Sequence, residues 1–308
     1  MNNLLDKAVP FVGWVSEGYR PAPRAFAVLR IAFAIYVLIW PRDIGWIAEM
    51  ARVAYAPPPG PFALLAGPPP SAVTTSLEVI RFGVALLVLV GWRTKLSSAV
   101  LSVVLVICSG LAYSYGKVDH LILFDLAPIF LGLGGWGCAY SIDSWRRKAG
   151  ETCGYVIFLY GTFVAFAMFT AAAAKAATGW LNPARQATRA FVAEAAVSPR
   201  SGPLTEWFLH LDYSLIWKLL DYVTLFAEGW LVLAVFFPTL FRCGLLLMGV
   251  FHVGVWLLLG IDFHPYIFVY AVFFLVPAKS WRREFALLRT WRASRAATAD
   301  GGFVGDPS

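Results

Sequence analysis

A lysine and two histidines lie in or beside strongly apolar stretches. Lys175 ends the small-residue run 169–174, His120 opens another apolar stretch, and His252 lies within 249–254. An ionisable side chain in lipid needs a partner or a function. Lys175 would lose hydration there and become available as a base, and the histidines could hydrogen-bond a polar head group or a developing oxyanion. These three residues are candidates to line one externally opening pocket.

Other charged residues also fall within apolar stretches, and we expect them to be buried: Arg30, Arg81, Asp125, Asp221 and Glu228. Residues three apart on a helix share a face, so Glu78 should pair with Arg81 and Lys218 with Asp221. Asp221 and Glu228 also share a face. We expect that face to point to a cavity or to cations such as Arg30 and Arg81. The cysteine and histidine spacing predicts no metal site.

Composition indicates the environment of these residues. The chain is 59% hydrophobic and only 14% charged, whereas soluble domains carry about a quarter charged residues. Its apolar stretches have the length that crosses about 30 Å of hydrocarbon as a helix. We predict an all-α bundle of about eight transmembrane spans, at 25–41, 76–92, 96–115, 120–140, 154–174, 214–237, 241–260 and 263–278.

The distribution of basic residues predicts orientation. Lysines and arginines are concentrated in the segments on the N-terminal side, as expected for cytoplasmic loops. Both termini are therefore predicted to be cytoplasmic, in a multi-pass protein of a bacterial-type plasma membrane. The predicted regions are a cytoplasmic segment 1–24, a membrane domain 25–278, and a basic cytoplasmic tail 279–308 with a disordered end.

Two external segments are long enough to have structure of their own. Segment 42–76 contains proline runs that favour an ordered loop over a helix. Segment 180–213 should contain an amphipathic helix around Phe191 and Val192, lying at the outer membrane surface.

The order of several short motifs resembles the HTTM (horizontally transferred transmembrane domain) family, which includes vitamin K-dependent gamma-glutamyl carboxylase. The likeness extends from about Leu29 to Pro277. The motifs are Leu29-Arg30-Ile31, Gly91-Trp92-Arg93-Thr94-Lys95, Asp119-His120 through Tyr140-Ser141-Ile142-Asp143, Lys175 with Trp180, and Phe251-His252.

The resemblance implies a role for each matching position. It implies that Lys175 and His120 are catalytic, with Lys175 as the base, and that His252, Asp119 and Trp180 bind the cofactor. It implies a reduced quinone, either vitamin K-like or menaquinol, as that cofactor. Asp119 stands where the carboxylase has asparagine, which would change the hydrogen bonding to a quinone oxygen.

Three functions follow as hypotheses. The leading one is a protein that binds a quinol-like or other amphipathic molecule in an outward-facing pocket and does base-initiated oxidative or carboxylation chemistry. The second is a non-enzymatic subunit of a larger membrane complex, respiratory or toxin-maturing, whose charges are satisfied by partner subunits. The third is a transporter that uses Asp221, Glu228 and His252 as a proton relay. No nucleic-acid partner is predicted.

Overall fold

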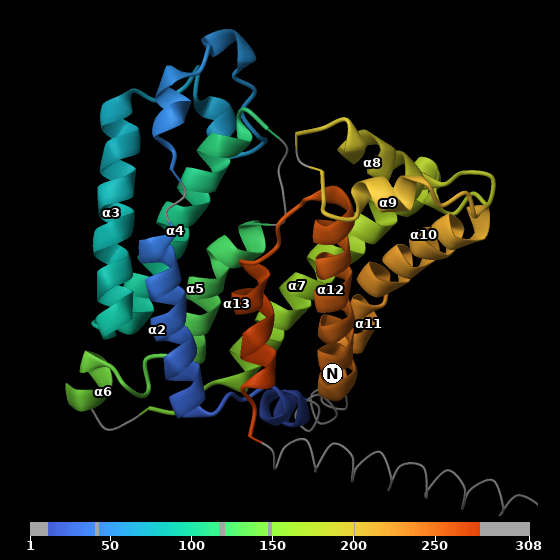
Figure 1. Cartoon of the computed structure of the whole chain (residues 1–308). Helices are drawn as coiled ribbons and strands as arrows, with labels where there is room; N and C mark the ends of the chain where they lie inside the picture. Colours follow the sequence, from blue (N-terminus) through green and yellow to red (C-terminus); the bar gives the residue numbers. More distant parts are fainter. Residues whose placement is uncertain (1–11, 41–42, 117–120, 147–149, 200, 278–308) are drawn as a thin grey trace, which may run out of the picture.

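A computed structural model describes residues 12–40, 43–116, 121–146, 150–199 and 201–277. Every regular element in these residues is helical, which confirms the all-α prediction. In Figure 1, α3 (Ser71–Val90) and α4 (Thr94–Tyr113) stand at one side of the bundle, and α8 (Ala187–Ala196) and α9 (Thr205–Leu209) lie across the upper end of the other side. Between them lie α2 (Pro23–Ile39), α5 (Ile122–Gly134), α7 (Gly154–Lys175), α12 (Pro238–Leu259) and α13 (Tyr266–Ala271).

Four described helices are long and apolar enough to cross a membrane: α3, α4, α12, and α7 together with the π-helical turn η4 (Ala176–Trp180). A fifth candidate is the pair formed by the helix Val12–Gly18 and α2, which are bent by 63°. The other predicted spans also contain helix, but shorter: α5, α10 (Ser214–Gly229) with α11 (Leu231–Ala234), and α13 with η5 (Val272–Phe274). The structure thus supports a membrane protein, while eight spans and cytoplasmic termini remain predictions.

The predicted span 120–140 is shortened by glycine. Gly135 adopts a φ of 96°, a left-handed conformation that ends α5 at Gly134. The predicted span 120–140 therefore extends past the end of the helix, because the chain turns at Gly135. The amide of Cys153 then donates to the carbonyl of Gly134 at 2.9 Å and brings the start of α7 beside this turn.

The proline-rich loop is ordered, as predicted. It forms three short 3₁₀ helices, η1 (Gly45–Glu49), η2 (Arg52–Ala54) and η3 (Pro61–Leu64). The Phe62 ring packs so closely on Gly110 of α4 that a Cβ there would lie 2.1 Å from it. Helix α3 begins at Ser71, five residues before our predicted boundary. Pro70 is its N-cap, a position that proline tolerates, whereas proline inside a helix would remove a backbone hydrogen bond.

Three motifs of the family resemblance meet at the lower end of the bundle. The fully buried guanidinium of Arg30 donates to the carbonyls of Trp136 and Ala139 at 3.2 Å each, and to that of Tyr140. Asp143 accepts from the amides of Arg93 and Thr94 at 2.9 and 2.6 Å, so it caps α4. These motifs hold α2, α4 and the turn after α5 together, which is a structural role.

The described residues before α2, which we predicted to be part of a separate N-terminal segment, pack into the core of the bundle. Tyr19 is fully buried, and its hydroxyl donates to the carbonyl of Val235 at 2.6 Å. Arg242, near the start of α12, donates to the carbonyls of Gly18 and Phe273. Both ends of the described chain are thereby tied to α12.

Candidate functional site

Lys175 forms an ion pair with Glu228. Its Nζ donates to both carboxylate oxygens, at 2.5 Å for Oε2. The Glu228 side chain is 5% exposed and that of Lys175 is 26% exposed. The helices approach closely here, since a Cβ on Gly229 of α10 would lie 3.5 Å from that of Ala172 on α7. Glu228 therefore faces a cation, as one of our two alternatives required, but that cation is Lys175 and neither Arg30 nor Arg81.

The helix changes form directly after Lys175. Residues Ala176–Trp180 make a π-helical turn in which Gly179 has a φ of 97°. This turn returns Trp180 toward Lys175, whose Nζ lies 5.7 Å from the indole centroid. Trp180 is 9% exposed and packs on Phe191 of α8. Lys175 and Trp180, which belong to one motif in the sequence, thus lie side by side in the structure, and π turns recur at functional sites.

The predicted Lys218–Asp221 pair is confirmed, at 3.0 Å. Both residues also satisfy backbone groups at helix ends. Asp221 accepts from the amides of Ala187 and Thr188 at the start of α8, at 3.1 and 2.8 Å. Lys218 donates to the carbonyl of Trp180, which ends the π turn. A carboxylate at an N-terminus and an ammonium at a C-terminus are both favourable, so this pair positions Trp180 and α8.

His252 lies in an aromatic cluster between α12 and α13. Its ring stacks on Phe263 at 4.1 Å and lies 4.9 Å from Tyr266 and 5.9 Å from Tyr270. Tyr270 is 8% exposed, and its hydroxyl has no hydrogen-bond partner within the described residues. Glu228 is close enough to interact electrostatically with that hydroxyl. Tyr270 therefore packs beside His252 and interacts electrostatically with Glu228.

The other predicted site residues lie elsewhere. His120 and Asp119 are outside the described residues. Asp125 is fully buried and accepts from the Ser109 hydroxyl at 2.5 Å. Arg81 donates to the carbonyl of Val37 at 2.9 Å. The predicted charge network is buried, but its members have separate local partners.

The expected Glu78–Arg81 pair is replaced by two backbone contacts. Glu78 accepts a hydrogen bond from the amide of Ile44 at 3.0 Å, while Arg81 donates to the carbonyl of Val37 in α2. Our prediction was wrong because a shared helix face does not decide between a side-chain partner and a nearby unsatisfied backbone group.

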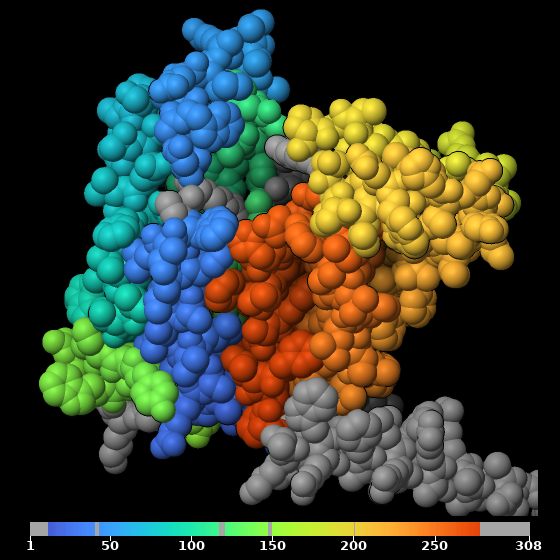
Figure 2. Space-filling model, viewed as in Figure 1, coloured from blue at the N-terminus to red at the C-terminus, as the bar shows by residue number. Residues whose placement is uncertain are grey.

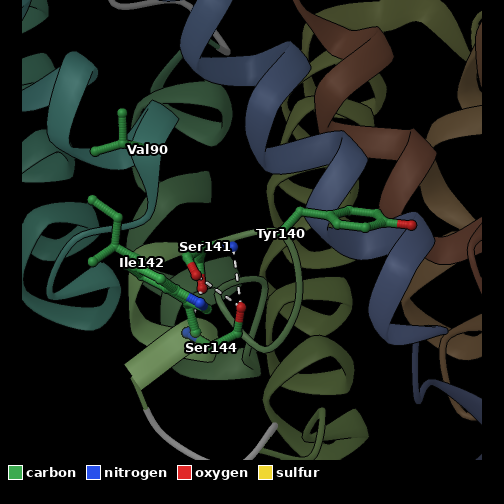
Figure 3. Close-up of a pocket in the computed structure, with 6 residues that line it drawn as sticks. Val90, Tyr140, Ser141, Ile142 and Ser144 are labelled. Atoms are coloured by element: carbon green, nitrogen blue, oxygen red, sulfur yellow. Dashed lines mark hydrogen bonds between the residues drawn. The ribbon is translucent and has the colours of Figure 1, made fainter.

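A hollow of about 600 Å³ opens at the lower end of the bundle. Figure 3 shows it beside Val90 and Ile142, with the Tyr140 ring turned away from them. Ser141 and Ser144 form its polar part and hydrogen-bond each other, at 2.8 Å from the Ser144 amide to the Ser141 hydroxyl. None of the predicted site residues lines this hollow.

A second polar cluster, missed in the sequence, lies where α2 ends and α13 begins. The Tyr36 hydroxyl is 2.6 Å from Nε2 of His264, and Nδ1 of the same ring contacts Asp262. Asp262-Phe263-His264 is a short loop sequence whose spacing alone suggests no site. Only the return of α13 beside α2 reveals the arrangement.

Comparison with known proteins adds no identification. No protein family, curated protein sequence or solved structure matches this chain significantly.

Proposed function

We propose that this chain is an HTTM-like membrane protein that binds a quinol-like amphipathic molecule near the end of the bundle predicted to be external. In this proposal Lys175 and Glu228 act as an acid–base couple on the head group of the ligand. The observation that carries the proposal is their ion pair, because it joins the predicted base to a buried carboxylate.

Burial makes a proton transfer between these two side chains possible. Two charges in surroundings of low polarity lose hydration, and their mutual attraction offsets that loss only in part. Transfer of one proton from Nζ of Lys175 to the Glu228 carboxylate would leave two neutral groups. The neutral amine could then take up a proton from a ligand hydroxyl, with Glu228 as the adjoining proton store.

The neighbouring side chains fit a quinone head group. Trp180 and the His252–Phe263 stack make aromatic surroundings that suit a planar ring. The buried Tyr270 hydroxyl lacks a hydrogen-bond partner within the described residues, which costs free energy. A ligand oxygen that accepts its proton in a hydrogen bond would remove that penalty. A reduced quinone, when bound, supplies an acidic hydroxyl and two electrons for oxidative chemistry.

The roles of the residues then differ. Lys175 accepts a proton at Nζ, Glu228 stores the proton that Lys175 first gave up, and Tyr270 and His252 orient the ligand oxygen. Lys218 and Asp221 keep Trp180 and α8 in place and do not touch the ligand. His120 and Asp119 stay proposed ligand-side residues on the strength of the family resemblance alone.

The proposal is tested by mass spectrometry of lipids extracted from the gently purified full chain. We expect a stoichiometric quinone with the wild type and with the exposed control Lys95→Ala, and a depleted one with Lys175→Ala and Glu228→Gln. Lys175→Arg preserves the charge but cannot readily release a proton. It should therefore retain the quinone and lose quinol-dependent oxygen uptake.

Other outcomes would favour the remaining hypotheses. Absence of any quinone together with stoichiometric co-purification of another membrane protein would support a subunit role. Proton flux into liposomes that depends on Glu228 and His252, again without a quinone, would support a transporter. Unchanged quinone content in Lys175→Ala would refute the proposed site.

A further inference from the structure

The loop between α12 and α13 carries an Asp–His pair that reaches the end of α2. Asp262 is half exposed, with 56% of its side chain accessible, and the His264 side chain is 36% exposed. The Asp262 carboxylate binds the His264 amide through Oδ1 at 2.8 Å and the ring through Oδ2. Two contacts from one carboxylate fix the orientation of the imidazole.

These contacts also determine which ring nitrogen carries the proton. An ionised carboxylate only accepts hydrogen bonds, so Nδ1 of His264 must donate to Asp262. In the neutral ring, Nε2 is then an acceptor. The Tyr36 hydroxyl, 2.6 Å away, donates to it. The order Asp262, His264, Tyr36 is that of an activated hydroxyl, in which a base takes the proton and a third group orients the base.

Aromatic side chains surround the Tyr36 ring. Trp40 is 60% exposed, stacks parallel to Tyr36, and lies 5.1 Å from the His264 ring. Phe124 and Phe268 pack against Tyr36 at 5.5 and 4.9 Å. In Figure 2, residues 43–66 and α8–α9 rise on either side above the upper end of α2. An exposed indole beside a relay of this kind suits a planar aromatic ligand.

We propose that Tyr36, His264 and Asp262 form a second acid–base site, one that ionises an aromatic hydroxyl stacked against Trp40. The ligand hydroxyl gives its proton to the Tyr36 oxygen while the Tyr36 proton passes to Nε2 of His264. The products are a ligand oxyanion and an imidazolium ion, which Asp262 stabilises. Atoms and charge balance without any oxidant, and the step does not depend on the Lys175–Glu228 pair.

The site is tested with 4-nitrophenol as the probe, using the full chain in lipid nanodiscs. Below the pKa of the free phenol, wild-type protein should produce a saturable phenolate absorption band. Tyr36→Phe keeps the ring but removes the hydroxyl, and His264→Gln removes the base, so each should abolish the band. Asp262→Asn should weaken phenolate formation about tenfold or more, since it replaces a charge-assisted hydrogen bond.

Two control variants show whether the phenolate band belongs to this site. Tyr213→Phe, at an exposed tyrosine on the same end of the bundle, should behave like the wild type. Lys175→Ala should also keep the band, so that loss of quinone from that variant and loss of phenolate from the relay variants are independent results. The proposal is overturned if wild-type protein forms no phenolate, or if Tyr36→Phe and His264→Gln form it normally.

Discussion

Asp221 should contribute far more to stability than another aspartate in the same region. It is fully buried, pairs with Lys218, and accepts three hydrogen bonds from Ala187 and Thr188, two from backbone amides and one from a hydroxyl. Asp221→Ala removes all of these and leaves the Lys218 ammonium buried without its counterion. Breaking a buried ion pair from one side costs about 3–5 kcal/mol.

The matched control is Asp212→Ala. Asp212 pairs with Arg189 of α8 at 3.2 Å, but its side chain is 91% exposed. Exposed ion pairs contribute about 0–1 kcal/mol because water and salt screen them. Both substitutions delete a carboxylate that contacts α8. The difference between their effects on stability therefore measures what burial and helix capping contribute at Asp221.

The assay is thermal unfolding of the detergent-solubilised chain, at one scan rate because membrane proteins commonly unfold irreversibly. For a chain of this size, 1 kcal/mol corresponds to a shift of about 2 °C. We expect Asp221→Ala to lower the apparent Tm by about 6–10 °C and Asp212→Ala by about 2 °C or less. Asp221→Asn keeps an acceptor for α8 and should fall between them. Equal shifts for the two alanine variants would refute the assignment of Asp221 as a buried cap and counterion.

Three further predictions concern the lower end of the bundle. Gly91→Ala should reduce the yield of folded protein, since φ is 69° and the new Cβ would lie 2.3 Å from that of Ser141. Gly83→Ala should be tolerated, because nothing lies within 4 Å of its new Cβ. Equal yields of the two variants would contradict this prediction. Arg30→Lys should destabilise the fold by about 1–3 kcal/mol, because one ammonium cannot replace the planar guanidinium that reaches three carbonyls; an unchanged Tm would argue against that geometry. Burial raises the pKa of the Cys138 thiol. Its alkylation should therefore need a higher pH than that of glutathione, because less thiolate is present at any given pH, and a rate profile matching glutathione would exclude this.

Sequence patterns located the helices well but not their ends. Apolar length identified helical segments at every predicted span, since hydrocarbon thickness and backbone satisfaction both require it. The end of α5 and the start of α3 were misplaced because they depend on one left-handed glycine and one proline. Such local geometry outweighs average hydropathy.

Charge pairing was predicted correctly at one of two equally spaced pairs. The Lys218–Asp221 pair follows from helical spacing, and the structure contains it. Glu78 and Arg81 have equal spacing, yet each bonds a different backbone group, because neighbouring helices placed those groups within reach. Helical periodicity therefore makes a contact feasible, and tertiary packing determines whether it forms.

What the sequence by itself determined is the helical, membrane-suited character of the chain and the burial of its isolated charges, since both follow from composition and transfer energetics. Only the tertiary structure joined Lys175 to Glu228 across 53 positions and Tyr36 to His264 across 228. No pattern within one helix encodes such partners. They are decided by which helix faces meet when the bundle closes.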